Sequence, residues 1–156
     1  MDFWNIAVPS LIFLAPILAI AILGLSRGAG DRGSIAELRW AAGVFGIALI
    51  TAIVGVVRFE QPVKLELLLA LSTEPSGYFE FAFQLHWMRF LWIAFAAAIL
   101  LALTLFDGSR ALEGENKASK LSFLLGSFLF SALAFLSENT ILSLMFIEVT
   151  VFLLYA

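Results

Sequence analysis

Residues 3–25 read FWNIAVPSLIFLAPILAIAILGL, an uncharged run that decides the fold class. A helix that crosses about 30 Å of hydrocarbon needs on the order of 20 apolar residues, and this run is long enough. It follows Asp2 rather than a basic segment, and it is longer than the apolar part of a signal peptide. We therefore expect it to be retained as a membrane-spanning helix.

Four further apolar runs with few charges follow along the chain. Together with the first run, they predict an all-α membrane protein with about five transmembrane helices in a single domain, residues 1–156. The expected helices are residues 3–25, 40–57, 88–106, 120–137 and 139–156.

The composition excludes several classes of protein. The 156 residues are 62% hydrophobic and 13% charged, which is about half the charged fraction of a soluble domain and rules out a soluble enzyme. The net charge of -3 and the lack of a basic cluster argue against a nucleic-acid partner. With no Cys and a single His, we expect no metal site and no cofactor. The sequence holds no catalytic site of its own, so whether the chain serves an enzyme complex stays open.

Basic residues in the loops predict the orientation in the membrane. The loops after the first and third helices hold six of the nine Lys and Arg residues, at positions 27, 32, 39, 110, 117 and 120. The loop between the second and third helices, residues 58–86, together with its flank at Arg89 holds the other three. Because basic loops stay in the cytoplasm, we expect the N-terminus outside and the C-terminus inside. We expect the membrane to be a bacterial inner membrane.

The loop of residues 58–86 shows a pattern of its own. Residues 79–86 alternate apolar and mainly polar side chains, which is typical of a strand, and residues 72–77 form a turn-rich cluster. Residues 64–71 could pair back to complete a small extracytoplasmic hairpin. The alternative is an irregular loop that lies on the membrane surface with its aromatic side chains as anchors.

Four polar side chains near or within the helices are weaker candidates for a functional role. For Ser127 and Ser131 we expect a role in close helix packing rather than in ion conduction, because small residues let helix backbones approach each other. Arg89 is interpreted as an interfacial anchor, with a link in a proton path as the alternative. His86 stands alone, which favours interfacial hydrogen bonding over ligation.

Glu148 is the strongest candidate for function. It lies nine residues beyond Asn139, which places it about 13 Å into the membrane. An ionised side chain at that depth costs a few kcal/mol and marks a functional site by default. Its helical neighbours are apolar, and none of the other expected helices has a basic residue at mid-depth. The alternative is a neutral acid that is hydrogen-bonded to Ser127 or Ser131.

Residues 120–148 resemble the fourth and fifth helices of the antiporter-like proton-channel subunits. This family includes the large membrane subunits of respiratory complex I, the Mrp sodium/proton antiporters, energy-converting hydrogenases and the membrane subunit of inorganic-carbon accumulation. The likeness rests on the Ser137-Glu138-Asn139 turn and on Phe146-Ile147-Glu148, where the family has phenylalanine-tryptophan-glutamate. Ile147 departs from that motif, and so does the Leu85–Leu91 stretch, where the family has Leu-Asp-Gly-Leu-Ser.

The resemblance implies a role in proton or sodium translocation within a multisubunit membrane complex. Glu148 would exchange charge with a lysine on a neighbouring helix, which another membrane subunit is expected to supply. The chain resembles only the amino-terminal third of such a subunit, which implies half of a split subunit, a reduced subunit or a fragment. The alternative function is a non-conducting scaffold subunit of such a complex.

Overall fold

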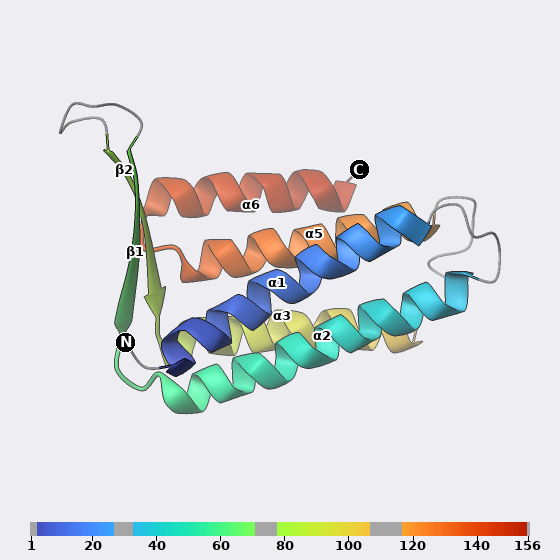
Figure 1. The fold of residues 1–156 in the computed structure, drawn as a ribbon, viewed down its shortest axis with the longest axis horizontal. Helices are drawn as coiled ribbons and strands as arrows, with labels where there is room; N and C mark the ends of the chain where they lie inside the picture. Colours follow the sequence, from blue (N-terminus) through green and yellow to red (C-terminus); the bar gives the residue numbers. More distant parts are fainter. Residues whose placement is uncertain (1–2, 27–32, 71–77, 107–116, 156) are drawn as a thin grey trace.

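A computed structural model describes residues 3–26, 33–70, 78–106 and 117–155. These residues form five helices and one β-hairpin between the second and third helices, as the sequence predicts (Figure 1). In chain order the elements are α1 (Phe3–Ser26), α2 (Gly33–Arg58), β1 (Val63–Ala70), β2 (Tyr78–Leu85), α3 (Trp87–Phe106), α5 (Lys117–Leu136) and α6 (Thr140–Tyr155).

The five helices lie side by side along one common direction. The hairpin crosses one end of the helices, next to the start of α1, the end of α2 and the start of α3 (Figure 1). The turn between α5 and α6 lies at this same end. We call it the hairpin end. The start of α1 and the hairpin therefore lie at the same end of the bundle.

Three of the helices are long and apolar enough to cross a membrane, namely α1, α2 and α3. The apolar parts of α5 and α6, Lys120–Leu136 and Thr140–Tyr155, are shorter. These features indicate an integral membrane protein. The second helix begins at Gly33 rather than at Trp40, because the helix continues beyond the apolar run through Glu37 and Arg39.

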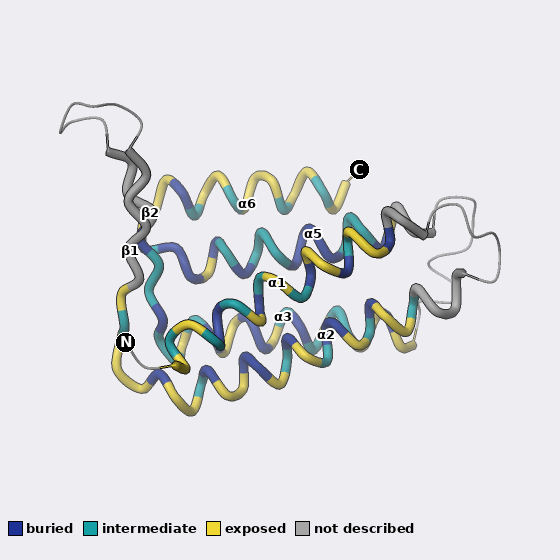
Figure 2. Tube along the Cα trace, viewed as in Figure 1, coloured by how far each residue is buried: buried dark blue, intermediate teal, exposed yellow. Residues whose placement is uncertain are grey.

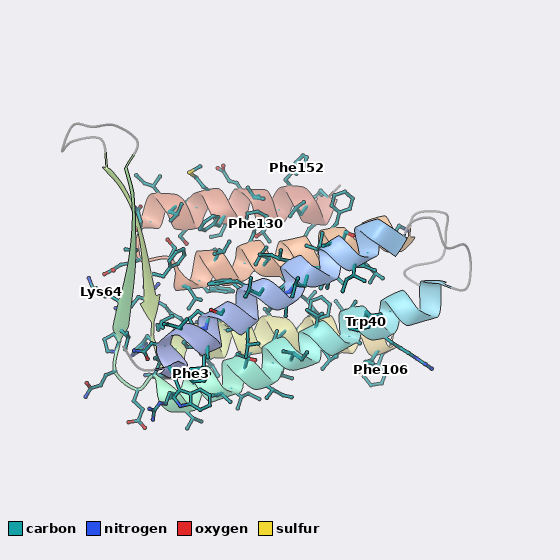
Figure 3. The ribbon with its side chains drawn as sticks, viewed as in Figure 1. Phe3, Trp40, Lys64, Phe106, Phe130 and Phe152 are labelled. Atoms are coloured by element: carbon teal, nitrogen blue, oxygen red, sulfur yellow. The ribbon has the colours of Figure 1, made fainter. Side chains whose placement is uncertain are left out.

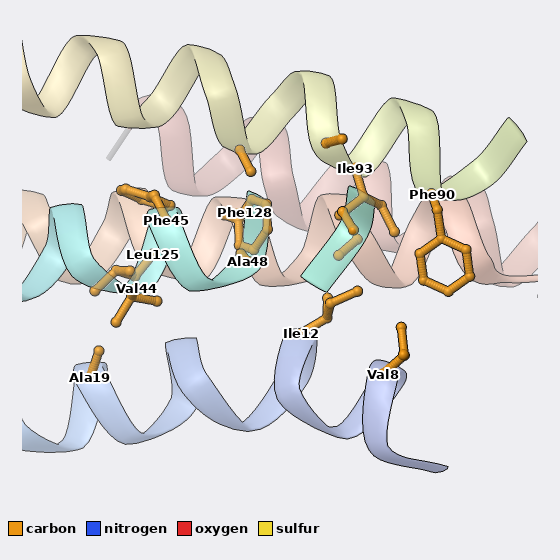
Figure 4. Packing of buried hydrophobic residues seen from close by; sticks show 14 of the residues in the cluster. Val8, Ile12, Ala19, Val44, Phe45, Ala48, Phe90, Ile93, Leu125 and Phe128 are labelled. Atoms are coloured by element: carbon orange, nitrogen blue, oxygen red, sulfur yellow. The ribbon is translucent and has the colours of Figure 1, made fainter. Parts of the chain in front are cut away.

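The core lies among α1, α2, α3 and α5 (Figure 4). Helix α6 packs on the outside against α5 (Figure 1). Phe45 of α2 and Phe128 of α5 meet edge to face at its centre, with ring centroids 5.7 Å apart. Small residues bring α2 close to α3. A Cβ at Gly55 would lie 2.5 Å from the Phe90 ring, so only glycine fits there. Phe90 also stacks on Phe59, the buried residue that follows α2.

The hairpin is antiparallel, with Val63 opposite Leu85 and Ala70 opposite Tyr78. This confirms the strand prediction over the irregular-loop alternative. The register puts residues 79, 81, 83 and 85 on one face, opposite the odd-numbered residues of β1. Leu85 is buried, and the ring of Phe83 lies 6.3 Å from that of Phe13 in α1. The base of the hairpin thus packs on the helices through its apolar face.

Candidate functional site

One side of α6 packs against α5. The Phe146 and Phe130 rings are 6.1 Å apart, and the Ser143 hydroxyl donates a hydrogen bond to the Ala134 carbonyl at 3.0 Å. The α6 residues that are not exposed all share this side: Leu142, Ser143, Phe146, Thr150 and Leu153. The other residues of α6 are exposed (Figure 2).

Glu148 lies on the opposite side of α6. Successive residues of an α-helix are rotated by about 100°, so Glu148 is turned by about 200° from Phe146. Its carboxyl group is exposed and has no hydrogen bond or ion pair with any described residue. The side chains one turn away in both directions are apolar and exposed, namely Leu144, Met145, Val151 and Phe152. Figure 3 shows Phe152, which is 71% exposed. We call these four residues and Glu148 the outer face of α6.

The start of α6 is fixed by a side-chain cap. The Asn139 side-chain oxygen accepts hydrogen bonds from the backbone N–H groups of Ile141 at 2.9 Å and Leu142 at 3.4 Å. Such a cap satisfies donors that the first turn of a helix leaves free. Asn139 before an apolar run is a recognised helix-start signal, so the sequence could have revealed this role. The cap sets where α6 begins and hence how far along the helix Glu148 lies.

Arg89 holds the end of α5. Its guanidinium donates from Nη1 to the backbone carbonyls of Phe135 at 3.2 Å, Leu136 at 3.0 Å and Ser137 at 2.6 Å. The last carbonyls of a helix have no partner within the helix, and a cation there is favourable. Arg89 therefore ties α3 to the turn that precedes α6, a role that the sequence analysis missed.

The hairpin contacts the same turn. The Glu138 backbone N–H donates to the Ala82 carbonyl at 2.8 Å, and Phe83 forms a β-bridge with Ser137. The Glu138 side chain also pairs with Lys64 at 2.6 Å. This ion pair is partly exposed, so it adds little to stability. The turn of residues 137–139 is thus held from two sides, by α3 and by the hairpin.

Ser127 and Ser131 do not contact Glu148. The Ser127 hydroxyl donates to the Leu124 carbonyl and the Ser131 hydroxyl to the Ser127 carbonyl, both at 2.8 Å and within α5. Because each hydroxyl has one proton, neither serine can also donate to the carboxyl group in this arrangement. The structure therefore does not bring together the residues that a neutral, serine-bonded Glu148 would need.

His86 lies just before α3, away from α6. Its ring lies 5.6 Å from that of Trp87, and its carbonyl accepts from the backbone N–H groups of Arg89 and Phe90. The His86 carbonyl thus accepts the first hydrogen bonds of α3. Among the described residues, no group of three or more His, Cys, Asp or Glu side chains could hold a metal ion.

Neither a protein-family model nor a curated protein matches this chain. The outer face of α6 and the turn before it are therefore the features of the molecule that bear on function.

Proposed function

We propose that this chain is an antiporter-like membrane subunit that takes part in proton or sodium translocation within a multisubunit complex. All five helices cross the membrane in this proposal, with the hairpin end outside and the other end in the cytoplasm of a bacterial cell. Glu148 is the ion-handling carboxyl group. A basic residue on a helix of another membrane subunit, most simply a lysine, is its partner.

The position of Glu148 on the outer face of α6 carries the proposal. An ionised carboxylate that faces lipid near mid-membrane costs about 2.5–3.5 kcal/mol by insertion scales, and such residues face partners or water instead. Since α5 covers the other side of α6, a partner for Glu148 has to approach from outside the described bundle. The likeness of the Phe146-Ile147-Glu148 segment to the family motif supports the same role.

The composition of the core favours an ion path along the surface of the helix bundle rather than through its interior. Within the described residues, no buried side-chain nitrogen or oxygen lacks a hydrogen-bond partner. The buried hydroxyls of Thr51, Thr104 and Ser127 donate to carbonyls of their own helices, and apolar side chains fill the space between them. An ion route that includes Glu148 therefore runs at the interface between α6 and its partner.

The experiment compares ion transport by the whole complex in vesicles with Glu148 variants. Glu148→Gln keeps the size of the side chain but removes its titratable charge, so it should abolish or strongly reduce uptake while assembly stays intact. Glu148→Asp, one methylene shorter, should keep partial activity. Glu60→Gln makes the same change at an exposed position after α2 and should leave transport unchanged.

The alternative is a non-conducting scaffold subunit, for which an apolar core without an unpartnered buried polar atom, as found in the described residues, is sufficient. In that case the outer face of α6 serves assembly alone, and Glu148 forms a static bond to its partner. Transport that is unchanged in Glu148→Gln, in a complex of normal composition, would decide for the scaffold.

A further inference from the structure

A groove lies between α1 and α2 at the hairpin end, on helices other than α6. It has a volume of about 350 Å³ and is lined by Trp4 of α1 and by four residues of α2, namely Ile53, Val54, Val57 and Arg58. The α2 residues follow the three- and four-residue spacing that places them on one stripe of a helix. The groove is therefore apolar, with one cation at its end.

Arg58 is the last residue of α2 and lies where the apolar span ends. The next residue, Phe59, turns inward, is buried and stacks on Phe90 at 5.2 Å, while Arg58 stays exposed. Arg58 makes no ion pair with any described residue. Among the described residues its positive charge thus has no acidic partner, and it lies at the end of the apolar span beside the apolar side chains of the groove.

Trp4 forms the opposite wall at the same depth. It is 45% exposed and belongs to the first turn of α1, which lies beside the end of α2 (Figure 1). Tryptophan favours the membrane–water boundary, because its ring is apolar and its N–H group can donate a hydrogen bond. The groove therefore has an apolar floor, an interfacial aromatic wall and a cation at the level of lipid headgroups.

We propose that this groove binds an anionic phospholipid. The phosphate pairs with Arg58, the Trp4 N–H group donates to the glycerol or ester oxygens, and an acyl chain lies on Ile53, Val54 and Val57. Charge complementarity decides the occupant, since a zwitterionic lipid would leave the Arg58 charge without a net counterion. Apolar side chains on α2 continue the exposed stripe toward mid-membrane at Ile50 and Ile47, which gives the acyl chain room to extend.

The test uses a chain in which Trp4 is the only tryptophan, after Trp40, Trp87 and Trp92 are each replaced by Phe. This chain is labelled with 5-hydroxytryptophan at Trp4, whereas its partners in the complex contain ordinary tryptophan. The assembled complex is then reconstituted in phosphatidylcholine vesicles. A minor fraction of the lipid is brominated phosphatidylglycerol or, in the matched sample, brominated phosphatidylcholine. The 5-hydroxytryptophan at Trp4 can be excited selectively, without exciting the tryptophans of the partners. Because bromine quenches a nearby indole, the fluorescence of this residue reports which lipid occupies the groove.

We expect quenching to reveal about a fivefold preference for phosphatidylglycerol, the selectivity that one surface Arg supplies. Arg58→Gln should remove the preference. Arg39→Gln, which removes the same charge from the exposed opposite end of α2, should keep it.

Three results would overturn the proposal. The first is equal quenching by the two brominated lipids in the starting chain. The second is a preference that survives Arg58→Gln, or one that Arg39→Gln removes equally. The third is competition by inorganic phosphate in solution, which would mean that Arg58 binds a free anion rather than a lipid. None of these outcomes depends on the role of Glu148.

Discussion

The guanidinium of Arg89 near the start of α3 donates a 2.6 Å hydrogen bond to the carbonyl oxygen of Ser137 just after α5. The same nitrogen also reaches the carbonyls of the two preceding residues. One side chain thus satisfies three acceptors at a helix end, where the helix itself offers no donors. It joins the start of α3 to the end of α5.

We expect Arg89→Met to lower the free energy of unfolding by about 2 kcal/mol, since hydrogen bonds to charged groups contribute about 1.5–3 kcal/mol. Methionine keeps an unbranched apolar stem in place of the aliphatic part of arginine but cannot donate. Arg89→Lys should lose less, because an ammonium group still donates to the carbonyls and still favours a helix C-terminus. Equilibrium unfolding in detergent micelles measures all three proteins.

The control for this series is Arg39→Met in α2, where the arginine is exposed and should matter by no more than about 0.5 kcal/mol. Equal losses for Arg39→Met and Arg89→Met would show that charge alone, and not the contact with α5, accounts for the effect.

The helices and the hairpin could be predicted because each leaves a local pattern. An uncharged run of sufficient length identifies a helix in hydrocarbon, and alternation identified β2. The start of α2 was harder to place. The length of an apolar run measures the part of a helix that suits hydrocarbon, whereas α2 continues through Glu37 and Arg39, whose charges suit water.

The contacts of the site could not be predicted in the same way. Arg89 and its acceptors are 46 to 48 residues apart in the chain, and no local pattern links them. The sequence also does not show which side of α6 meets α5, because α6 carries apolar residues on all of its sides. Only the packed structure shows that Phe146 faces α5 and that Glu148 faces away from it.

Gly55 should tolerate no larger residue. The ring of Phe90 lies 2.5–2.9 Å from the position of a Cβ there, so Gly55→Ala forces α2 and α3 apart and should cost about 1–3 kcal/mol of stability. Gly46→Ala, where a Cβ meets nothing within 4 Å, is the matched control and should cause no loss. Thermal unfolding in detergent compares them.

A second substitution tests the cause. Phe90→Leu replaces the ring by a smaller side chain. In the double variant Gly55→Ala/Phe90→Leu it should recover part of the lost stability, so the losses of the two single variants should be less than additive. Strictly additive losses would contradict the steric explanation.

The proposed orientation predicts which segments reach the outside. Cysteines at Ser76 and Ser109 lie outside the described residues, in the segments that join β1 to β2 and α3 to α5. In intact cells, an impermeant thiol reagent should label the Ser76→Cys chain and should label Ser109→Cys only after the membrane is opened. The reverse pattern would invert the orientation and leave the fold unaffected.

The outer face of α6 should contact a second membrane subunit. Val151 lies on this face and is 47% exposed, whereas Leu142 lies on the side toward α5 and is 4% exposed. With a photoreactive amino acid at Val151, illumination of native membranes should cross-link the chain to a membrane protein that carries a basic residue within a transmembrane helix. The same group at Leu142 should react within the chain.

The partner identified in this way also tests the charge pairing. Replacing its mid-membrane basic residue by Gln should lower transport as Glu148→Gln does, and combining both changes should add little further loss, because the two residues would act as one unit. Cross-linking at Val151 to lipid alone would leave the outer face of α6 without a protein partner and refute this prediction.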